Sequence, residues 1–142
     1  MENFGLIGLA ASLSLAAVGS ALGAGAAGMS AVGAWKKCFA QNRPAPFMLI
    51  AFVGAPLTQT IYGMILMNAL RTAASEELQL GVGVLGGMAI GFSALFQGKA
   101  GAAASDALAE TGKGFANYII VLGLIETVAL FVMVFLMGII GG

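Results

Sequence analysis

The sequence predicts an all-α integral membrane protein. Of its 142 residues, 60% are hydrophobic and only 8% are charged, and the mean hydropathy is +1.01. Six basic and six acidic residues are too few to cover the surface of a soluble core of this size, whereas lipid solvates an apolar exterior directly. Histidine is absent, and the lone Cys38 permits neither an intrachain disulfide nor a thiolate metal cluster. We therefore expect the lipid bilayer, and no nucleic acid, as a partner.

The charged residues divide the chain into apolar spans that are each long enough to cross a bilayer. Four such spans are predicted, at about residues 4–34, 46–70, 78–104 and 114–140. Each exceeds the roughly 20 helical residues that cross the hydrocarbon. The connections 36–45, 71–77 and 106–113 are short. The spans should therefore form two antiparallel hairpins, residues 1–73 and 74–142.

The basic residues predict the orientation of these hairpins. Five of the six lie in or beside the first and third connections: Lys36, Lys37, Arg43, Lys99 and Lys113. Cytoplasmic loops of membrane proteins carry an excess of Lys and Arg. We therefore expect a multi-pass protein of the cell membrane whose loops 36–45 and 106–113 are cytoplasmic and whose termini both lie outside.

The two hairpins resemble one another in sequence. Residues 20–28 (SALGAGAAG) match residues 93–101 (SALFQGKAG), and residues 57–60 (LTQT) match residues 124–127 (LIET). The shift in register between the two matches is absorbed by a shorter second cytoplasmic loop. This pattern predicts a tandem-duplicated hairpin whose copies run the same way through the membrane.

Glycine is concentrated in spans 4–34 and 78–104. Gly19 with Gly23, and Gly83 with Gly87, form small-xxx-small pairs that let helix backbones approach closely in lipid. Four helices within one subunit would need fewer glycines, so we expect a narrow inner ring contributed by many subunits. The bulky residues of the other two spans should face lipid: Phe47, Phe52, Tyr62, Met64, Met67, Phe131, Met133, Phe135 and Met137.

Glu126 is a carboxylate near the middle of the last span. It lies thirteen residues after Lys113 and sixteen before the C-terminus, which corresponds to roughly 20 and 24 Å of helix. An ionisable side chain at that depth costs a few kcal/mol by insertion scales and marks a functional site by default. The alternative is a protonated glutamic acid that joins helices by hydrogen bonding.

Polar residues gather on one face of span 46–70, at the depth of Glu126. Ala55, Thr58, Gln59 and Tyr62 follow an i, i+3, i+4, i+7 spacing and share a helix face. Gln59 stands where the second hairpin has its carboxylate. Pro56 removes a backbone donor, so we expect a kink that tilts nearby carbonyls toward a bound ion.

Gln97 adds an amide at the same depth from the neighbouring span. Its counterpart in the first hairpin is Ala24, which has no ligand atom. Together the polar side chains and the Ala55 carbonyl supply a carboxylate, two amide oxygens, a hydroxyl and a carbonyl. Hard cations take several oxygen ligands, whereas a bound proton needs only the carboxylate and one acceptor. The set favours Na⁺ and leaves H⁺ as the alternative.

These motifs resemble the membrane rotor proteolipid of V-type ATPases, also called the K subunit, and are closest to the bacterial sodium-translocating kind. They are P-x-T-Q-x-x-Y at residues 56–62, F-Q-G-K at 96–99 and L-I-E-T at 124–127. The resemblance implies a non-catalytic subunit that assembles into a homo-oligomeric ring. The ring binds Na⁺, contacts central-stalk subunits at its cytoplasmic loops and turns against a static membrane subunit, driven by ATP hydrolysis in a soluble motor.

The resemblance also implies a role for each site residue. Glu126 is the ion-binding carboxylate, and Tyr62 hydrogen-bonds it and closes the site. The other ligands are the side-chain oxygens of Thr58, Gln59 and Gln97 and the carbonyl of Ala55.

Two other functions are compatible with four membrane helices and one carboxylate. A small proton-coupled multidrug exporter is expected to carry its glutamate in the first helix beside an aromatic pocket, whereas here that span has no carboxylate and the single tryptophan, Trp35, lies at its end. A structural tetraspan would use Glu126 only to join helices.

Overall fold

The computed structural model describes residues 3–141, and this part of the chain contains helices and no strand. Its elements are α1 (Phe4–Ala40), α2 (Leu49–Gly54), the 3₁₀ turn η1 (Ala55–Leu57), α3 (Thr58–Leu70), α4 (Glu76–Thr111) and α5 (Phe115–Gly141). α2, η1 and α3 follow one another without a break and act as one rod. Four stretches are long and apolar enough to span a membrane: Phe4–Ala40, Leu49–Leu70, Glu76–Thr111 and Phe115–Gly141. The predicted four-span, all-α architecture is confirmed.

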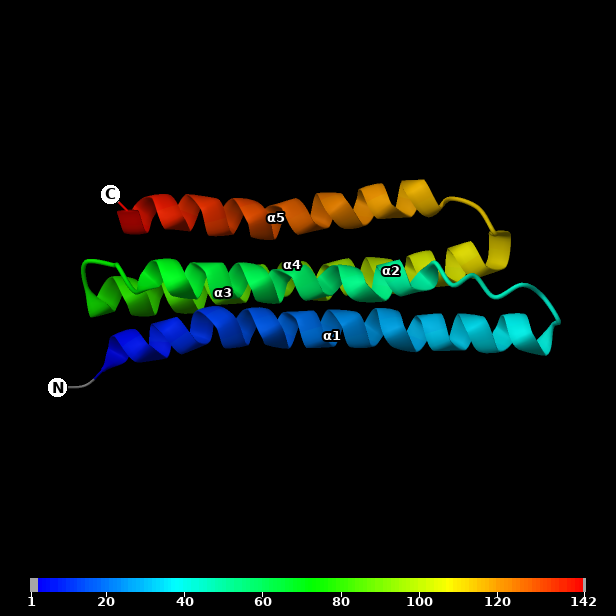
Figure 1. The fold of residues 1–142 in the computed structure, drawn as a ribbon, viewed down its shortest axis with the longest axis horizontal. Coiled ribbons are helices and arrows are strands. Elements are labelled where there is room, and N and C mark those ends of the chain that lie inside the picture. Colours follow the sequence, from blue (N-terminus) through cyan, green and yellow to red (C-terminus); the bar gives the residue numbers. More distant parts are fainter. Residues whose placement is uncertain (1–2, 142) are drawn as a thin grey trace.

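The helices lie side by side as two hairpins (Figure 1). α1 begins and α5 ends at one end of the bundle, together with the α3–α4 connection, and the connections after α1 and after α4 lie at the opposite end. α1 packs along α4, while α5 packs against α4 and α3. The hairpins therefore run in the same direction, with α1 and α4 in contact across the boundary between them.

Two helices extend well beyond the predicted spans. α1 continues past Lys36 and Lys37 to Ala40, and α4 continues past Asp106 to Thr111. The predicted extents of the connections 36–45 and 106–113 were therefore wrong. Charged residues mark the edge of the apolar stretch, but Lys is a good helix former and does not end a helix. With 37 residues, α1 is about 55 Å long, whereas the hydrocarbon is about 30 Å thick.

α4 begins and ends with local capping signals. The Ser75 hydroxyl accepts the N–H of Leu78 at 3.2 Å, which satisfies one of the free donors of the first turn. Gly112 follows the helix with a φ of +67°, the left-handed conformation that glycine adopts without strain. These two signals explain why the connections on either side of α4 are tight.

The glycines of α1 and α4 let the two backbones touch. A Cβ on Gly19 would overlap the backbone of Gly91, and one on Gly98 would overlap the backbone of Gly23. These glycines therefore serve a contact within the chain, and the inner ring contributed by many subunits stays a prediction. The close contact lets the two backbones pack directly against each other, and van der Waals packing of this kind holds helices together in lipid. Other glycines of the two helices have open space around them: Gly25, Gly33 and Gly81.

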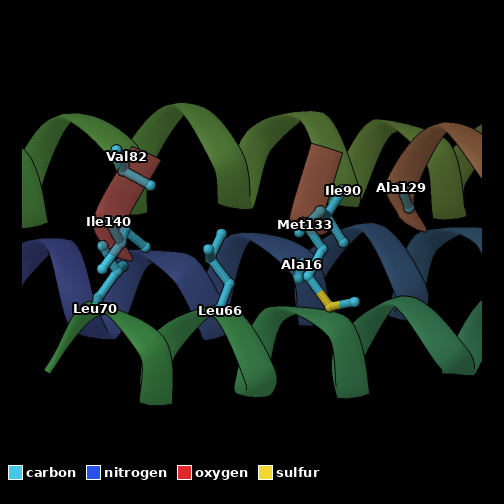
Figure 2. Packing of buried hydrophobic residues seen from close by; sticks show 8 residues of the cluster. All are labelled: Ala16, Leu66, Leu70, Val82, Ile90, Ala129, Met133 and Ile140. Atoms are coloured by element: carbon cyan, nitrogen blue, oxygen red, sulfur yellow. The ribbon is translucent and has the colours of Figure 1, made fainter. Parts of the chain in front are cut away.

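Two apolar clusters lie at different heights in the bundle. The outer cluster, nearer the chain ends, joins all four spans (Figure 2): Ala16, Leu66, Leu70, Val82, Ile90, Ala129, Met133 and Ile140. The loop-end cluster lies toward the α1–α2 and α4–α5 connections: Ala31, Ala34, Leu49, Phe52, Ala104, Leu108 and Leu122.

Two residues expected to face lipid are instead buried. Phe52 has no exposed surface and Met133 is 7% exposed. Phe52 packs against the rings of Phe115 and Tyr118, and Met133 lies in the outer cluster. The glycine-rich helices leave space that only large side chains of the neighbouring helices fill. Other bulky residues, such as Phe47 and Phe135, are exposed as predicted.

Candidate functional site

The polar residues meet in a layer between the two apolar clusters. Glu126 lies on α5 and is half-buried, while Gln59 of α3 and Gln97 of α4 have no exposed surface. In sequence, each of these residues stands between a residue of the loop-end cluster and one of the outer cluster on the same rod. The site is therefore a polar layer enclosed above and below by apolar packing.

Three donors hold the carboxylate of Glu126. The Thr58 hydroxyl donates to Oε1 at 2.5 Å, and the Tyr62 hydroxyl donates to the same oxygen at 3.0 Å. The Gln97 amide donates to Oε2 at 3.2 Å. Hydrogen bonds to an ionised acceptor are stronger than neutral ones. α3 and α4 thus replace part of the hydration that the carboxylate lacks in the membrane.

The Thr58 hydroxyl oxygen and three neighbouring oxygen atoms form a cluster. Oγ1 of Thr58 lies 3.0 Å from the Ala55 carbonyl oxygen, 3.1 Å from Oε1 of Gln59 and 2.5 Å from Oε1 of Glu126. A hydroxyl has one hydrogen to donate, so at most one of these three contacts is fully satisfied by it. An oxygen cluster with too few hydrogens is the arrangement that a hard cation stabilises.

The 3₁₀ turn η1 places the carbonyl of this cluster. Pro56 is the middle residue of η1 and has no N–H to continue the α-helical pattern. The rod changes from α-helix to a 3₁₀ turn at Pro56, and the predicted kink stays a prediction. Thr58, Gln59 and Tyr62 contact α4 or α5 through their side chains, which agrees with the shared helix face that their spacing predicted.

The two glutamines form a directed chain of hydrogen bonds. Nε2 of Gln59 donates to Oε1 of Gln97 at 2.9 Å. Nε2 of Gln97 in turn donates to the Leu122 carbonyl at 2.9 Å and to Glu126. Gln97 lies at the depth predicted for it, but it turns its nitrogen, and not its oxygen, toward the carboxylate.

Ser93 is a member of this network that the sequence analysis did not single out for the site. Its hydroxyl donates to the Ile125 carbonyl at 2.9 Å and accepts from Nε2 of Gln59 at 3.4 Å. The available signal was its position four residues before Gln97, which places both on one face of α4. A lone serine in a glycine-rich helix is too common to be chosen on that signal alone.

The structure brings every predicted site residue together. Glu126, Thr58, Gln59, Gln97 and Tyr62 are linked by side-chain hydrogen bonds, and the Ala55 carbonyl joins them through Thr58. Within residues 3–141, no group of three or more His, Cys, Asp and Glu side chains is arranged to hold a metal. Any cation at this site would therefore be held by one carboxylate and neutral oxygens.

An ion pair joins the two hairpins at the loop end, outside the predicted apolar spans. Nζ of Lys37 on α1 pairs with the carboxylate of Glu110 on α4, and Arg43 donates to the Glu110 carbonyl at 3.4 Å. The hydrogen bond and the charge of Lys37 lower the pKa of Glu110, and Glu110 raises the pKa of Lys37. Both side chains are exposed, so the pair stabilises the fold little.

Comparison with known families links the second hairpin to a rotary ATPase. Residues 80–139 match the model of the family formed by the C subunit of ATP synthase. The matched segment contains Ser93, Gln97 and Glu126, and it covers less than half of the chain. No curated protein sequence matches the chain. The family match supports a proteolipid of the ATP synthase or V-ATPase type and indicates a membrane component that is not itself catalytic.

Proposed function

We propose that the protein is the ion-binding rotor-ring subunit of a rotary V-type ATPase and carries Na⁺ across the membrane. One observation carries the proposal: a single carboxylate lies in the middle of a four-span unit, in contact with a cluster of neutral oxygens. The similarity of residues 80–139 to the C subunit of ATP synthase supports the rotor role. The resemblance of the motifs in both hairpins to the V-type proteolipid supports the finer assignment.

The proposed Na⁺ ligands are Glu126, Thr58, Gln59 and the Ala55 carbonyl. Gln97 holds the carboxylate in the present geometry, and its oxygen becomes a fifth ligand when its amide rotates toward the ion. Tyr62 donates to Glu126 at 3.0 Å and closes the site. The negative charge of Glu126 neutralises a monovalent cation, and the neutral oxygens replace its hydration shell. H⁺ is the alternative cargo, because a proton needs only the carboxylate and one acceptor.

Charge neutralisation explains how such a site would work in a ring. With an ion bound, Glu126 passes through lipid without the cost of a bare charge. Copies of the chain form the ring, which turns against a static membrane subunit and contacts central-stalk subunits at its cytoplasmic loops. The exposed apolar surface of α5, including Leu124, Val128 and Phe131, suits contact with lipid or with that static subunit.

Carbodiimide labelling of Glu126 tests both the site and its cargo. A carbodiimide reacts with a protonated carboxyl group in an apolar environment, so Glu126 of the purified ring should be labelled. We expect Na⁺ to protect it at fixed pH, and ²²Na⁺ to bind to the same preparation. Labelling that responds to pH and not to Na⁺ would reject Na⁺ and establish the H⁺ alternative.

A further inference from the structure

Gln59 can serve as an oxygen ligand only in one of the two orientations of its amide. In the structure Oε1 faces Thr58 at 3.1 Å, and Nε2 faces α4. The reverse orientation would place an N–H donor in the oxygen cluster, where it would repel a cation. Two acceptors on α4 favour the observed orientation over the reversed one: Oε1 of Gln97, 2.9 Å from Nε2, and the Ser93 hydroxyl, 3.4 Å from Nε2.

Ser93 is the acceptor that remains when the Gln97 oxygen rotates toward the ion, and its one hydrogen is already used. It donates to the Ile125 carbonyl at 2.9 Å, so only its lone pairs remain for Gln59. A lone pair accepts an N–H and repels an amide oxygen. The Ser93 side chain is 6% exposed, so water does not readily replace it as an acceptor.

We infer that Ser93 is a positioning residue for the proposed ion site: it fixes the Gln59 amide with its oxygen toward the cation. This inference rests on the proposed binding of Na⁺ at Glu126. Ser93 touches neither Glu126 nor the oxygen cluster, and it acts through Gln59. It also ties α4 to the backbone of α5 one residue before Glu126, which keeps the carboxylate and the amide in register.

The chain provides a matched control at Ser20. Ser20 occupies the position of α1 that corresponds to Ser93 in the sequence repeat, and it is 2% exposed. Within residues 3–141 its hydroxyl has no hydrogen-bond partner. Removing that hydroxyl deletes a buried serine oxygen without breaking a hydrogen bond.

The test measures the Na⁺ concentration that half-protects Glu126 from a carbodiimide in the assembled ring of the full chain. We expect Ser93→Ala to raise this concentration roughly five- to tenfold, the effect of losing one neutral hydrogen bond. The labelling rate without Na⁺ should stay unchanged at the same pH, because Thr58, Tyr62 and Gln97 still hold the carboxylate. Ser20→Ala should match the wild type.

Two further variants separate positioning from packing. Ser93→Thr retains a hydroxyl and should restore protection toward the wild-type value. Ser93→Cys keeps nearly the same volume but accepts hydrogen bonds weakly, so it should raise the half-protecting Na⁺ concentration as Ser93→Ala does. It provides the same test if the alanine variant fails to assemble.

Each remaining outcome decides a separate question. If Ser93→Ala or Ser93→Cys is half-protected at the same Na⁺ concentration as Ser20→Ala and the wild type, the inference is overturned. The proposed function would still stand. Failure of both Ser93→Ala and Ser93→Cys to assemble would also overturn the inference, because the role of Ser93 would then be structural. A wild-type ring that Na⁺ does not protect would reject the proposed cargo and, with it, this role of Ser93.

Discussion

The two hairpins supply different chemistry to one site. The first hairpin contributes neutral oxygens, from Ala55, Thr58 and Gln59, whereas the second contributes the negative charge of Glu126. The sequence repeat aligns Gln59 with Glu126, so two matching positions carry an amide in one hairpin and a carboxylate in the other. The difference shows that neither hairpin has a complete set of groups. The proposed unit of function is therefore the pair, with one mid-membrane carboxylate for four spans.

Replacing the Glu126 carboxylate by an amide, the group that Gln59 carries at the matching position, should have the largest effect. Glu126→Gln keeps the shape of the side chain and can still accept from Thr58, so the ring should assemble. Ion uptake driven by ATP should fall to background in membrane vesicles that contain the complete ATPase, and a native gel checks assembly. Undiminished uptake would favour the structural tetraspan, in which Glu126 only joins helices.

The contact between the hairpins can be disturbed at a single glycine of α1. A Cβ at Gly23 would overlap the carbonyl of Ala94 on α4, whereas a Cβ at Gly25, two residues along, meets nothing within 4 Å. Overpacking of this kind costs about 1–3 kcal/mol. Gly23→Ala should lower the thermal unfolding midpoint of the protein in detergent, and Gly25→Ala should leave it unchanged. Equal midpoints would mean that α1 and α4 approach less closely than the structure describes.

The contribution of the first hairpin to ion binding can be measured at Thr58. Thr58→Val removes the hydroxyl at the centre of the oxygen cluster and retains the shape of the side chain. Polar contacts to charged groups contribute about 1.5–3 kcal/mol. The Na⁺ concentration that half-protects Glu126 should therefore rise by about tenfold or more. Thr58→Ser retains the hydroxyl and should bind Na⁺ nearly as the wild type does. If the valine variant binds normally, the first hairpin is not needed for the cation.

The surface contact between the hairpins should matter least. In Glu110→Gln the partner of Lys37 loses its charge, but both side chains are exposed, and such pairs are screened by water and salt. The folded-state pKa of Glu110 lies below its ordinary value of 4.5, so any stabilisation is present above that value and is lost as the pH falls through the folded pKa. Thermal midpoints at pH 7 and physiological salt should coincide within error. A clear drop would indicate a structural role for the loop end.

Most of the fold and the site could be predicted because membrane helices impose two simple rules. An apolar stretch of sufficient length must be a helix, and short connections make successive helices antiparallel. Depth along the helix then placed Gln59, Gln97 and Glu126 at one level, and the helical period placed Thr58 and Tyr62 on the same face as Gln59. Both inferences depend only on position along the chain.

The remaining features depend on how helices rotate about their own axes, which the sequence did not determine. Phe52 and Met133 are bulky like their lipid-facing neighbours, and only the packing of α4 and α5 shows that they point inward. The orientation of the Gln97 amide, with nitrogen toward Glu126, follows from the Leu122 carbonyl beside it. The role of Ser93 depends on Ile125, thirty-two residues away.

The two apolar clusters that enclose the polar layer have an electrical consequence. They are low-dielectric layers on either side of Glu126, so a transmembrane voltage would fall mainly across them and only slightly across the site. An ion that moved from one water phase to Glu126 would cross about half of the potential difference. At 100 mV this amounts to about 1.2 kcal/mol for a monovalent ion. Entry and exit would then share the electrical work about equally, and a change in voltage would affect both steps.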